Sequence, residues 1–327
     1  MRILKLLYFV LGVALLAVVV GETDIGEVLS LVLKIGWGLL AILAIYFAAF
    51  AIDSFTWLMA MPNQPMNALW TFRTWAVRMV GEAFNNVIPA ASMGGEPVKA
   101  VLLKKHYGVG YREAAASLIL AKTINMVSLC LFLVIGFGLV IASDVLTPSA
   151  KSVAAVGLSA LVLATFLFFA VQRYRITSLA GTWLSRQSFA KRLEDVLHHI
   201  HDMDERLVEF YTQYRGRMFW AVLLAFANWV LGAVEVYYAM MFLGHPVSWM
   251  DAWIIESVAQ MVRTGTFFIP ASIGAQEGAF LVISGAITGS PSLGLAVGIV
   301  RRLREIIWIA CGFAFGAVYS LSAGSAE

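Results

Sequence analysis

Charged residues are scarce in this sequence of 327 residues: Asp, Glu, Lys and Arg together make up 13%, where a soluble domain carries about 25%. Hydrophobic residues make up 61%, and the mean hydropathy is +0.83. This composition excludes an ordinary water-soluble fold. Nearly charge-free runs long enough to cross a bilayer lie at 6–20, 35–52, 123–142, 152–171, 218–243 and 306–322. The sequence therefore predicts an all-α polytopic membrane protein with about six full spans.

Cysteine is nearly absent, and nucleotide-binding and catalytic motifs are missing. Cys130 and Cys311 lie singly inside apolar runs, so we expect neither a disulfide framework nor a metal site. The sequence has no Walker loop, no His-Glu-x-x-His and no nucleophile elbow, and Gly108-Val-Gly110 lacks the third glycine of a dinucleotide site. The net charge of +3 does not suggest a nucleic-acid partner. We expect no cofactor, no metal and no catalytic residue.

The placement of basic residues predicts the orientation. Arg2 and Lys5 precede the first apolar run, and no small-x-small cleavage site follows at 18–21, which favours an uncleaved anchor with a cytoplasmic N-terminus. Residues 173–217 contain eight Lys and Arg residues, so we expect a cytoplasmic linker there. The distribution is typical of a multi-pass protein of the bacterial inner (cytoplasmic) membrane.

This linker is amphipathic. Its apolar residues alternate spacings of four and three: Phe189, Leu193, Val196, Ile200, Met203, Leu207, Phe210 and Tyr214. The pattern predicts a helix that packs on the bundle or lies at the level of the headgroups. A dimerising coiled coil, and with it a homodimer, is the alternative.

Two segments of the chain resemble each other. Pro89-Ala-Ala-Ser-Met-Gly-Gly-Glu96 matches Pro270-Ala-Ser-Ile-Gly-Ala-Gln-Glu277, and in both the Pro precedes the Glu by seven residues. An ionisable residue stands at the same distance before each Pro, Glu82 in one copy and Arg263 in the other. A polar pair three apart follows each Glu: Lys122 with Asn125, and Arg301 with Arg304. The ordered set indicates an internal repeat.

The repeat is expected to be inverted, because three predicted spans, 113–142, 152–171 and 218–243, separate its copies. Segments 70–88 with 97–103, and 252–268 with 275–288, are too short or too polar for independent spans. We interpret each pair as a re-entrant helical hairpin. Inverted repeats with broken helices are typical of transporters, and the breaks mark the binding site. The prediction is one domain, 1–327, with repeat one at about 30–142 and repeat two at about 218–322.

The breaks have a chemical consequence. Pro and Gly stop each helix, and the free N–H groups of the helix that follows can hold a phosphate. Arg301 and Arg304 share a helix face and could clamp an anion, and Arg301 could pair with Glu305. Arg302 fits a residue that extends to the headgroups. Glu235 and Glu256 are further ionisable residues at membrane depth. The alternative for each motif is a helix kink with a Glu cap.

The two motifs resemble a known family. Asn85-Asn86, Gly94-Gly95-Glu96-Pro97-Val98-Lys99-Ala100, Ile269-Pro270, Gly274-Ala-Gln276-Glu277-Gly278 and Arg301-Arg302-Leu-Arg304-Glu305 resemble the signatures of the lysylphosphatidylglycerol-synthase-type transmembrane (flippase-like) family. The residues of these motifs are most similar to those of the branch associated with hopanoid biosynthesis. The resemblance implies a lipid translocator. The residues of this sequence that match motif positions of the family are Asn86, Pro89, Gly94, Gly95, Glu96, Pro270, Gly274, Glu277, Arg301 and Arg304.

Three functions stay open. The first is translocation of a polar or charged lipid, such as a hopanoid, an aminoacyl-phospholipid or a polyprenyl-linked lipid, with a separate lipid-synthesising enzyme as a partner. No soluble synthase domain is expected, since the sequence ends at Glu327 just after the last span. The second is a membrane enzyme or enzyme subunit that modifies such a lipid, and the third is a scaffold that acts through the linker helix. Candidate substrate-binding residues are the motif positions above with Glu82, Lys122, Asn125 and Arg263.

Overall fold

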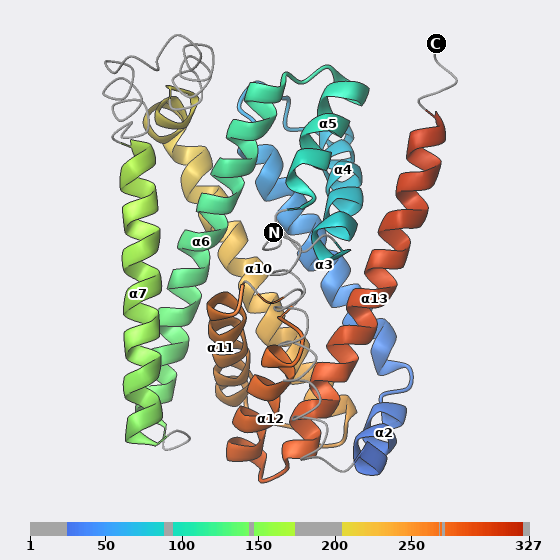
Figure 1. The fold of residues 1–327 in the computed structure, drawn as a ribbon, viewed down its shortest axis with the longest axis vertical. Coiled ribbons are helices and arrows are strands. Elements are labelled where there is room, and N and C mark those ends of the chain that lie inside the picture. Colours follow the sequence, from blue (N-terminus) through green and yellow to red (C-terminus); the bar gives the residue numbers. More distant parts are fainter. Residues whose placement is uncertain are drawn as a thin grey trace, which may run out of the picture.

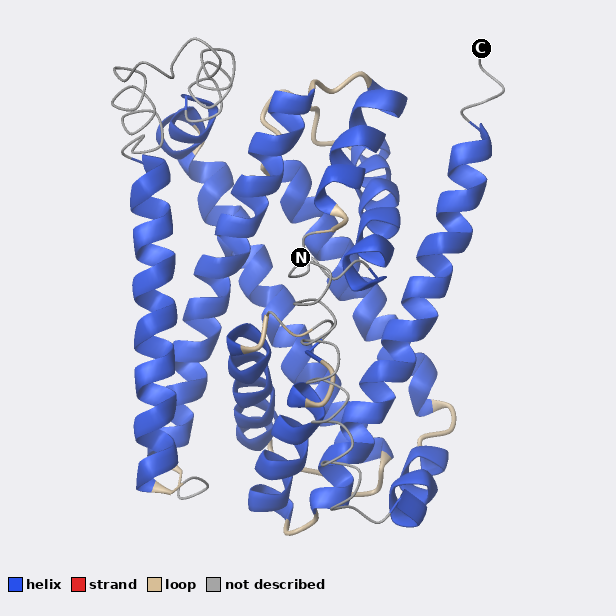
Figure 2. Ribbon diagram, in the orientation of Figure 1, coloured by secondary structure: helices blue, strands red, loops and turns tan. Residues whose placement is uncertain are grey.

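The computed structural model describes residues 25–87, 94–143, 147–173, 205–267, 269 and 272–322. Within these residues, the regular elements are helices and no strand occurs (Figure 2). The prediction of an all-α polytopic membrane protein is therefore confirmed. The first predicted span, 6–20, lies outside the described residues.

The first half of the chain places a helical hairpin between long helices. A short helix, α2 (Ile25–Lys34), precedes the apolar α3 (Gly38–Met59). The first predicted hairpin consists of α4 (Ala68–Val87) and α5 (Glu96–Tyr107). Two long helices follow, α6 (Tyr111–Ala142) and α7 (Pro148–Arg173).

The second half repeats this order. A long helix, α10 (Arg215–Phe242), leads into the second predicted hairpin, α11 (Trp249–Gly265) and α12 (Ala275–Thr288). The last helix is α13 (Pro291–Ser322). Ser248 caps α11 by accepting a hydrogen bond from the backbone N–H of Asp251, as expected at a helix start.

Four described stretches are long and apolar enough to cross a bilayer: Gly38–Met59, Tyr111–Ala142, Lys151–Phe168 within α7, and Arg215–Phe242. The last helix, α13, carries arginines in its first half. It has 32 residues, as α6 has, and runs between the two ends of the bundle (Figure 1).

The two hairpins enter the bundle from opposite ends. In Figure 1, α4 and α5 occupy the upper half, whereas α11 and α12 occupy the lower half. The long helices α3 and α10 pack along each other between them. Each hairpin also leans on the other half of the chain, since α4 packs against α13 and α11 packs against α6. This arrangement is the inverted repeat that the two motifs predict.

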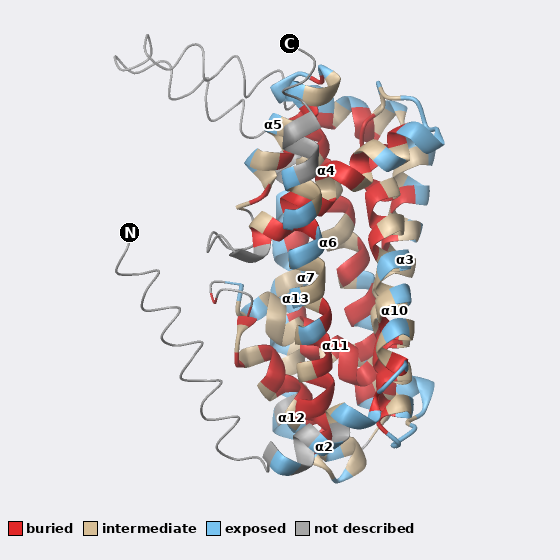
Figure 3. Cartoon of the chain, turned by 90° about the vertical axis from the view of Figure 1, so that its right-hand side faces the viewer, coloured by how far each residue is buried: buried red, intermediate tan, exposed pale blue. Residues whose placement is uncertain are grey.

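Polarity increases toward the interior of the bundle. Buried positions lie along the inner helix faces in Figure 3, and several of them are charged, including Asp53, Lys99, Glu235 and Glu256. Large apolar side chains point outward, such as Val153 and Val156 of α7, which are 74% and 70% exposed. Lipid tails solvate such an apolar surface, whereas ionisable groups in a membrane face inward and pair.

The end of the linker packs on the bundle. Residues 205–213 form a further short helix, in which Leu207 and Phe210 are buried against α3, α6 and α10. Burial raises the pKa of Tyr211 on this helix to about 12. For these residues the prediction of a helix packed on the bundle is confirmed. The other positions of the predicted apolar stripe, from Phe189 to Met203, lie outside the described residues.

Candidate functional site

Each hairpin breaks between two helices whose ends are held by polar side chains. In the first, α5 begins at Glu96 with Pro97 in its first turn, and the side-chain oxygen of Asn85 accepts a hydrogen bond of 2.7 Å from the backbone N–H of Gly95. In the second, Glu277 accepts a hydrogen bond of 2.9 Å from the N–H of Gly274, whose φ of 79° suits a glycine. At each helix start, a side chain of the protein therefore bonds to one of the backbone N–H groups near which we expected a phosphate.

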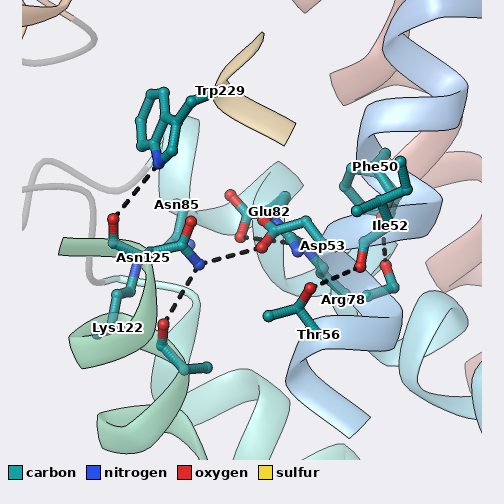
Figure 4. A network of polar contacts seen from close by, with 12 residues as sticks. Phe50, Ile52, Asp53, Thr56, Arg78, Glu82, Asn85, Lys122, Asn125 and Trp229 are labelled. Carbon is teal, nitrogen blue, oxygen red and sulfur yellow. Dashed lines mark hydrogen bonds and ion pairs between the residues drawn. The ribbon is translucent and has the colours of Figure 1, made fainter. Parts of the chain in front are cut away.

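The upper hairpin carries a chain of alternating charges (Figure 4). Arg78 forms a close ion pair with Asp53 of α3, and the amide nitrogen of Asn125 donates a hydrogen bond of 3.0 Å to the same carboxylate. The ammonium of Lys99 lies 2.7 Å from a carboxylate oxygen of Glu82 and 3.2 Å from one of Glu96. These contacts join α3, α4, α5 and α6 at membrane depth.

In the same network, the Lys122 ammonium reaches Glu96 at 3.3 Å. The other Glu96 oxygen, Oε2, is buried and has no hydrogen-bond partner among the described residues. Glu96 can therefore still accept a hydrogen bond from a ligand.

The lower half carries a second network, built around the arginines of α13. Arg301 donates two hydrogen bonds to Glu256 of α11, at 2.7 and 3.2 Å, and Arg304 forms a close ion pair with Glu235 of α10. Gln260 donates a hydrogen bond of 2.7 Å to Glu256. Such forked pairs fix geometry and remove the cost of an isolated buried charge.

Two interpretations of the α13 sequence are wrong. Arg301 does not form its ion pair with Glu305; its carboxylate partners are Glu256 and Glu235, because it faces α10 and α11. Arg302 does not extend to the headgroups. Its guanidinium contacts Glu277 at 2.5 Å and Glu305 at 2.8 Å, because α12 packs directly on α13.

The two networks correspond under the repeat. Asn125 bonds to Asp53 of α3, and Arg304, its counterpart, bonds to Glu235 of α10. Sequence reasoning did not place Asp53 or Arg78 in the site. A lone Asp in the apolar run of α3 is a signal that could have identified the first of them.

Two cavities adjoin inside the bundle. The lower one is lined by charged and aromatic residues that include Tyr46, Glu235, Arg304 and Trp308. The lining of the upper one includes Asp53, Glu96, Lys122 and Asn125. Three residues line both cavities: Glu82, Trp229 and Arg263. We call the region that these three residues line, between the two cavities, the waist.

The cationic side chains that line the cavities differ in their exposure and in how closely carboxylates pair with them. The side chains of Arg301 and Arg304 are 4% and 6% exposed and are held by carboxylates. Lys122 and Arg263 are 45% and 39% exposed, and the Arg263 guanidinium lies 3.9 Å from its carboxylate partner, Glu305. The two cations most able to meet a ligand therefore line the upper cavity, and one of them belongs to the waist.

The remaining candidates are distributed as follows. Asn86, Gly94 and Gly95 lie at the break of the first hairpin, and Pro89 and Pro270 lie outside the described residues. Glu96 lines the upper cavity. Glu277 is buried where α12 packs on α13, beside Arg302, and lines neither of these two cavities. The inverted repeat led us to expect that the buried charges of both motifs, Glu96 and Glu277 among them, converge on one cavity; for these two residues the expectation is wrong. The waist brings together Glu82 and Arg263 instead.

Comparison with known proteins gives the relatives. The chain is 24% identical over 321 residues to the UPF0104 membrane protein PH1989 of Pyrococcus horikoshii, covering 93% of each chain. It is 22% identical over 260 residues to a UPF0104 membrane protein of Methanothermobacter thermautotrophicus, covering 73% of this chain and 72% of that protein. No solved structure matches the chain.

A family model described as the lysylphosphatidylglycerol synthase TM region matches residues 3–312. The match covers both hairpins, both networks and the waist between the cavities. The chain belongs to the family of the lysylphosphatidylglycerol synthase transmembrane region.

Proposed function

We propose that this protein moves a polar or charged lipid between the leaflets of the bacterial inner membrane. The observation that carries this proposal is the pair of adjoining polar cavities between two inverted hairpins. Ionisable groups at membrane depth are costly, and they mark pathways for polar cargo. Alternating access by rocking of one repeat against the other suits this arrangement. The hydrocarbon tails stay in the bilayer throughout.

The upper cavity, including the waist, supplies the groups that hold the lipid headgroup. Lys122 and Arg263 bind its anionic part, because their exposed cationic groups line one cavity together. Glu82, at the waist, and Glu96, with its unpaired oxygen, accept hydrogen bonds from hydroxyl or ammonium groups of the same headgroup. Arg301 and Arg304 act on the site indirectly, by holding α10, α11 and α13 together.

The orientation in the membrane, the class of lipid and the partner enzyme are proposed from the sequence. The upper end of the bundle in Figure 1, with Lys104, Lys105 and Arg112, faces the cytoplasm, as the N-terminus does. The candidate lipids are hopanoids, aminoacyl-phospholipids and polyprenyl-linked lipids. A separate lipid-synthesising enzyme would supply them.

A reconstituted assay tests the proposal. We expect vesicles with the protein to invert a fluorescent aminoacyl-phosphatidylglycerol, and Lys122→Gln/Arg263→Gln to lower the rate at least about tenfold, since a lost charge-assisted hydrogen bond costs about 1.5–3 kcal/mol. The thermal midpoint should change little, because exposed ion pairs contribute about 0–1 kcal/mol. The matched control is Lys105→Gln, which removes an exposed cation outside the cavities. Equal rates for all three proteins would contradict the proposal, and a chemically altered lipid recovered from the vesicles would favour an enzyme instead.

A further inference from the structure

The inverted repeat gives the bundle two equivalent seams, and one of them is sealed. The seam between α6 and α10 is closed by close packing and by a hydrogen bond of 2.9 Å from the Ser128 hydroxyl to the Val222 carbonyl. The indole of Trp229 also donates across it to the Asn125 carbonyl, at 3.4 Å. Outside this seam, α7 covers α6, where Leu158 packs in one apolar cluster with Phe132.

The equivalent seam, between α13 and α3, is closed differently. The two helices barely touch through their backbones, and aromatic rings fill the space between them. Trp308 of α13 contacts three rings of α3: Tyr46 at 5.0 Å, Phe50 at 5.3 Å and Phe47 at 6.3 Å between centroids. Helix α4 packs against both helices of this seam, and Trp75 of α4 adds its ring to the cluster, 6.2 Å from Phe47 and 6.3 Å from Phe50.

The ring contacts form a thin wall with two different faces. On the inner face, Tyr46 and Trp308 line the lower polar cavity. On the outer face, Phe47 and Phe72 are 52% and 54% exposed, on helices that lie in the membrane. About one layer of side chains therefore separates the polar cavity from the lipid tails.

The tryptophan side chains at the two seams also differ in whether their indole N–H groups have hydrogen-bond partners. Trp229 and Trp253, at the sealed seam, donate to backbone carbonyls at 3.4 and 3.3 Å. The Nε1–H groups of Trp75 and Trp308, at the aromatic wall, are buried and have no hydrogen-bond partner among the described residues. A buried donor without a partner is costly. An oxygen atom of a lipid at this wall would give these N–H groups the partner that they lack.

We propose that the aromatic wall between α3 and α13 is the doorway through which the lipid substrate enters and leaves the polar cavity, with its hydrocarbon chains lying against Phe47 and Trp308. The occupant is a lipid because the outer face of the wall lies in the bilayer and its inner face lines a polar cavity. This inference rests on the proposed function. It adds that passage occurs on one side of the molecule, because the direct packing and the hydrogen bonds between α6 and α10 close the other.

Reversible cross-linking tests the doorway. In a background with Cys130→Ala and Cys311→Ala, the variant Phe47→Cys/Trp308→Cys is joined by a short, reducible bifunctional thiol reagent in vesicles. Cross-linking should lower the inversion rate of the fluorescent aminoacyl-phosphatidylglycerol at least about tenfold, because the reagent ties α3 to α13, and reduction should restore the rate. Each variant is compared with itself before and after the reagent, so the loss of the two rings does not enter the result.

The matched control is Phe226→Cys/Trp253→Cys, whose ring centroids are also 6.3 Å apart but lie beside the sealed seam. Its rate should change less than about twofold on cross-linking, since nothing passes there. Equal loss in both variants, or no loss at Phe47 and Trp308, would overturn the doorway while the proposed function stands. If the cysteine-free background itself does not invert the lipid, both the doorway and the proposed function are overturned.

Discussion

At the scale of single residues, the interior of this bundle is held by charges in pairs. Arg301 and Glu256 are separated by 45 positions in sequence, yet their side chains meet at 2.7 and 3.2 Å in a forked pair. A carboxylate that has lost such a partner would keep its full charge inside the membrane. The stability of the bundle therefore depends on both members being present.

Removing one member of this pair should cost far more than removing both. We expect Arg301→Gln to lower the free energy of unfolding by about 3–5 kcal/mol, because Glu256 then stays charged and buried. The double variant Glu256→Gln/Arg301→Gln should recover most of that loss, since two amides can hydrogen-bond to each other. Denaturant unfolding in detergent micelles measures both, and a double variant no more stable than the single one would disprove the argument.

The sequence revealed part of this chemistry. It identified Arg301 and Arg304 because arginines in an apolar context are conspicuous locally. It could not reveal their partners, since Glu235 lies 69 positions from Arg304 and only the packing of α10 on α13 brings them together. The partner of Asp53 could not be read from the sequence for the same reason, since Asn125 is 72 positions away.

At the scale of helices, glycines set how closely the elements approach. A Cβ atom on Gly294 of α13 would lie 2.1 Å from the carbonyl oxygen of Phe280 on α12. In the first hairpin, a Cβ on Gly95 would lie 1.8 Å from the carbonyl oxygen of Gly81. Backbones this close leave no room for any side chain. The local motifs predicted where these helices break, but not this contact, which depends on how they pack.

Glycine-to-alanine substitutions should separate contact from helix propensity. We expect Gly294→Ala to destabilise the protein by about 1–3 kcal/mol, because backbone must move to admit the methyl group. Gly138→Ala in α6, where nothing lies within 4 Å of the added Cβ, should be neutral or stabilise by up to about 1 kcal/mol. Thermal unfolding midpoints give the comparison, and equal effects at the two sites would refute the close approach of α12 and α13.

At the scale of the whole molecule, the chain folds into two halves that are inverted relative to each other (Figure 1). The sequence predicted this from an odd number of spans between two similar motifs, and the helices occupy the predicted segments closely. It could not predict that Glu96 and Glu277 lie apart while Glu82 and Arg263 share the waist. The distance between the halves depends on the crossing of α3 and α10, which no local pattern encodes.

The inverted arrangement can be tested by accessibility from the two sides. Lys105 lies at the base of the first hairpin and His245 at the base of the second, both exposed. With the native cysteines replaced, His245→Cys should react with a membrane-impermeant maleimide in intact spheroplasts, and Lys105→Cys only after permeabilisation. Labelling of both from the same side would contradict the inversion.

The repeat places a carboxylate, Glu82, where its other copy has a guanidinium, Arg263, and both line the same two cavities. A protein assembled from two copies of the first half would set acid against acid at that position, and one from two copies of the second half would set base against base. The halves have become complements of each other, and neither can any longer substitute for its twin.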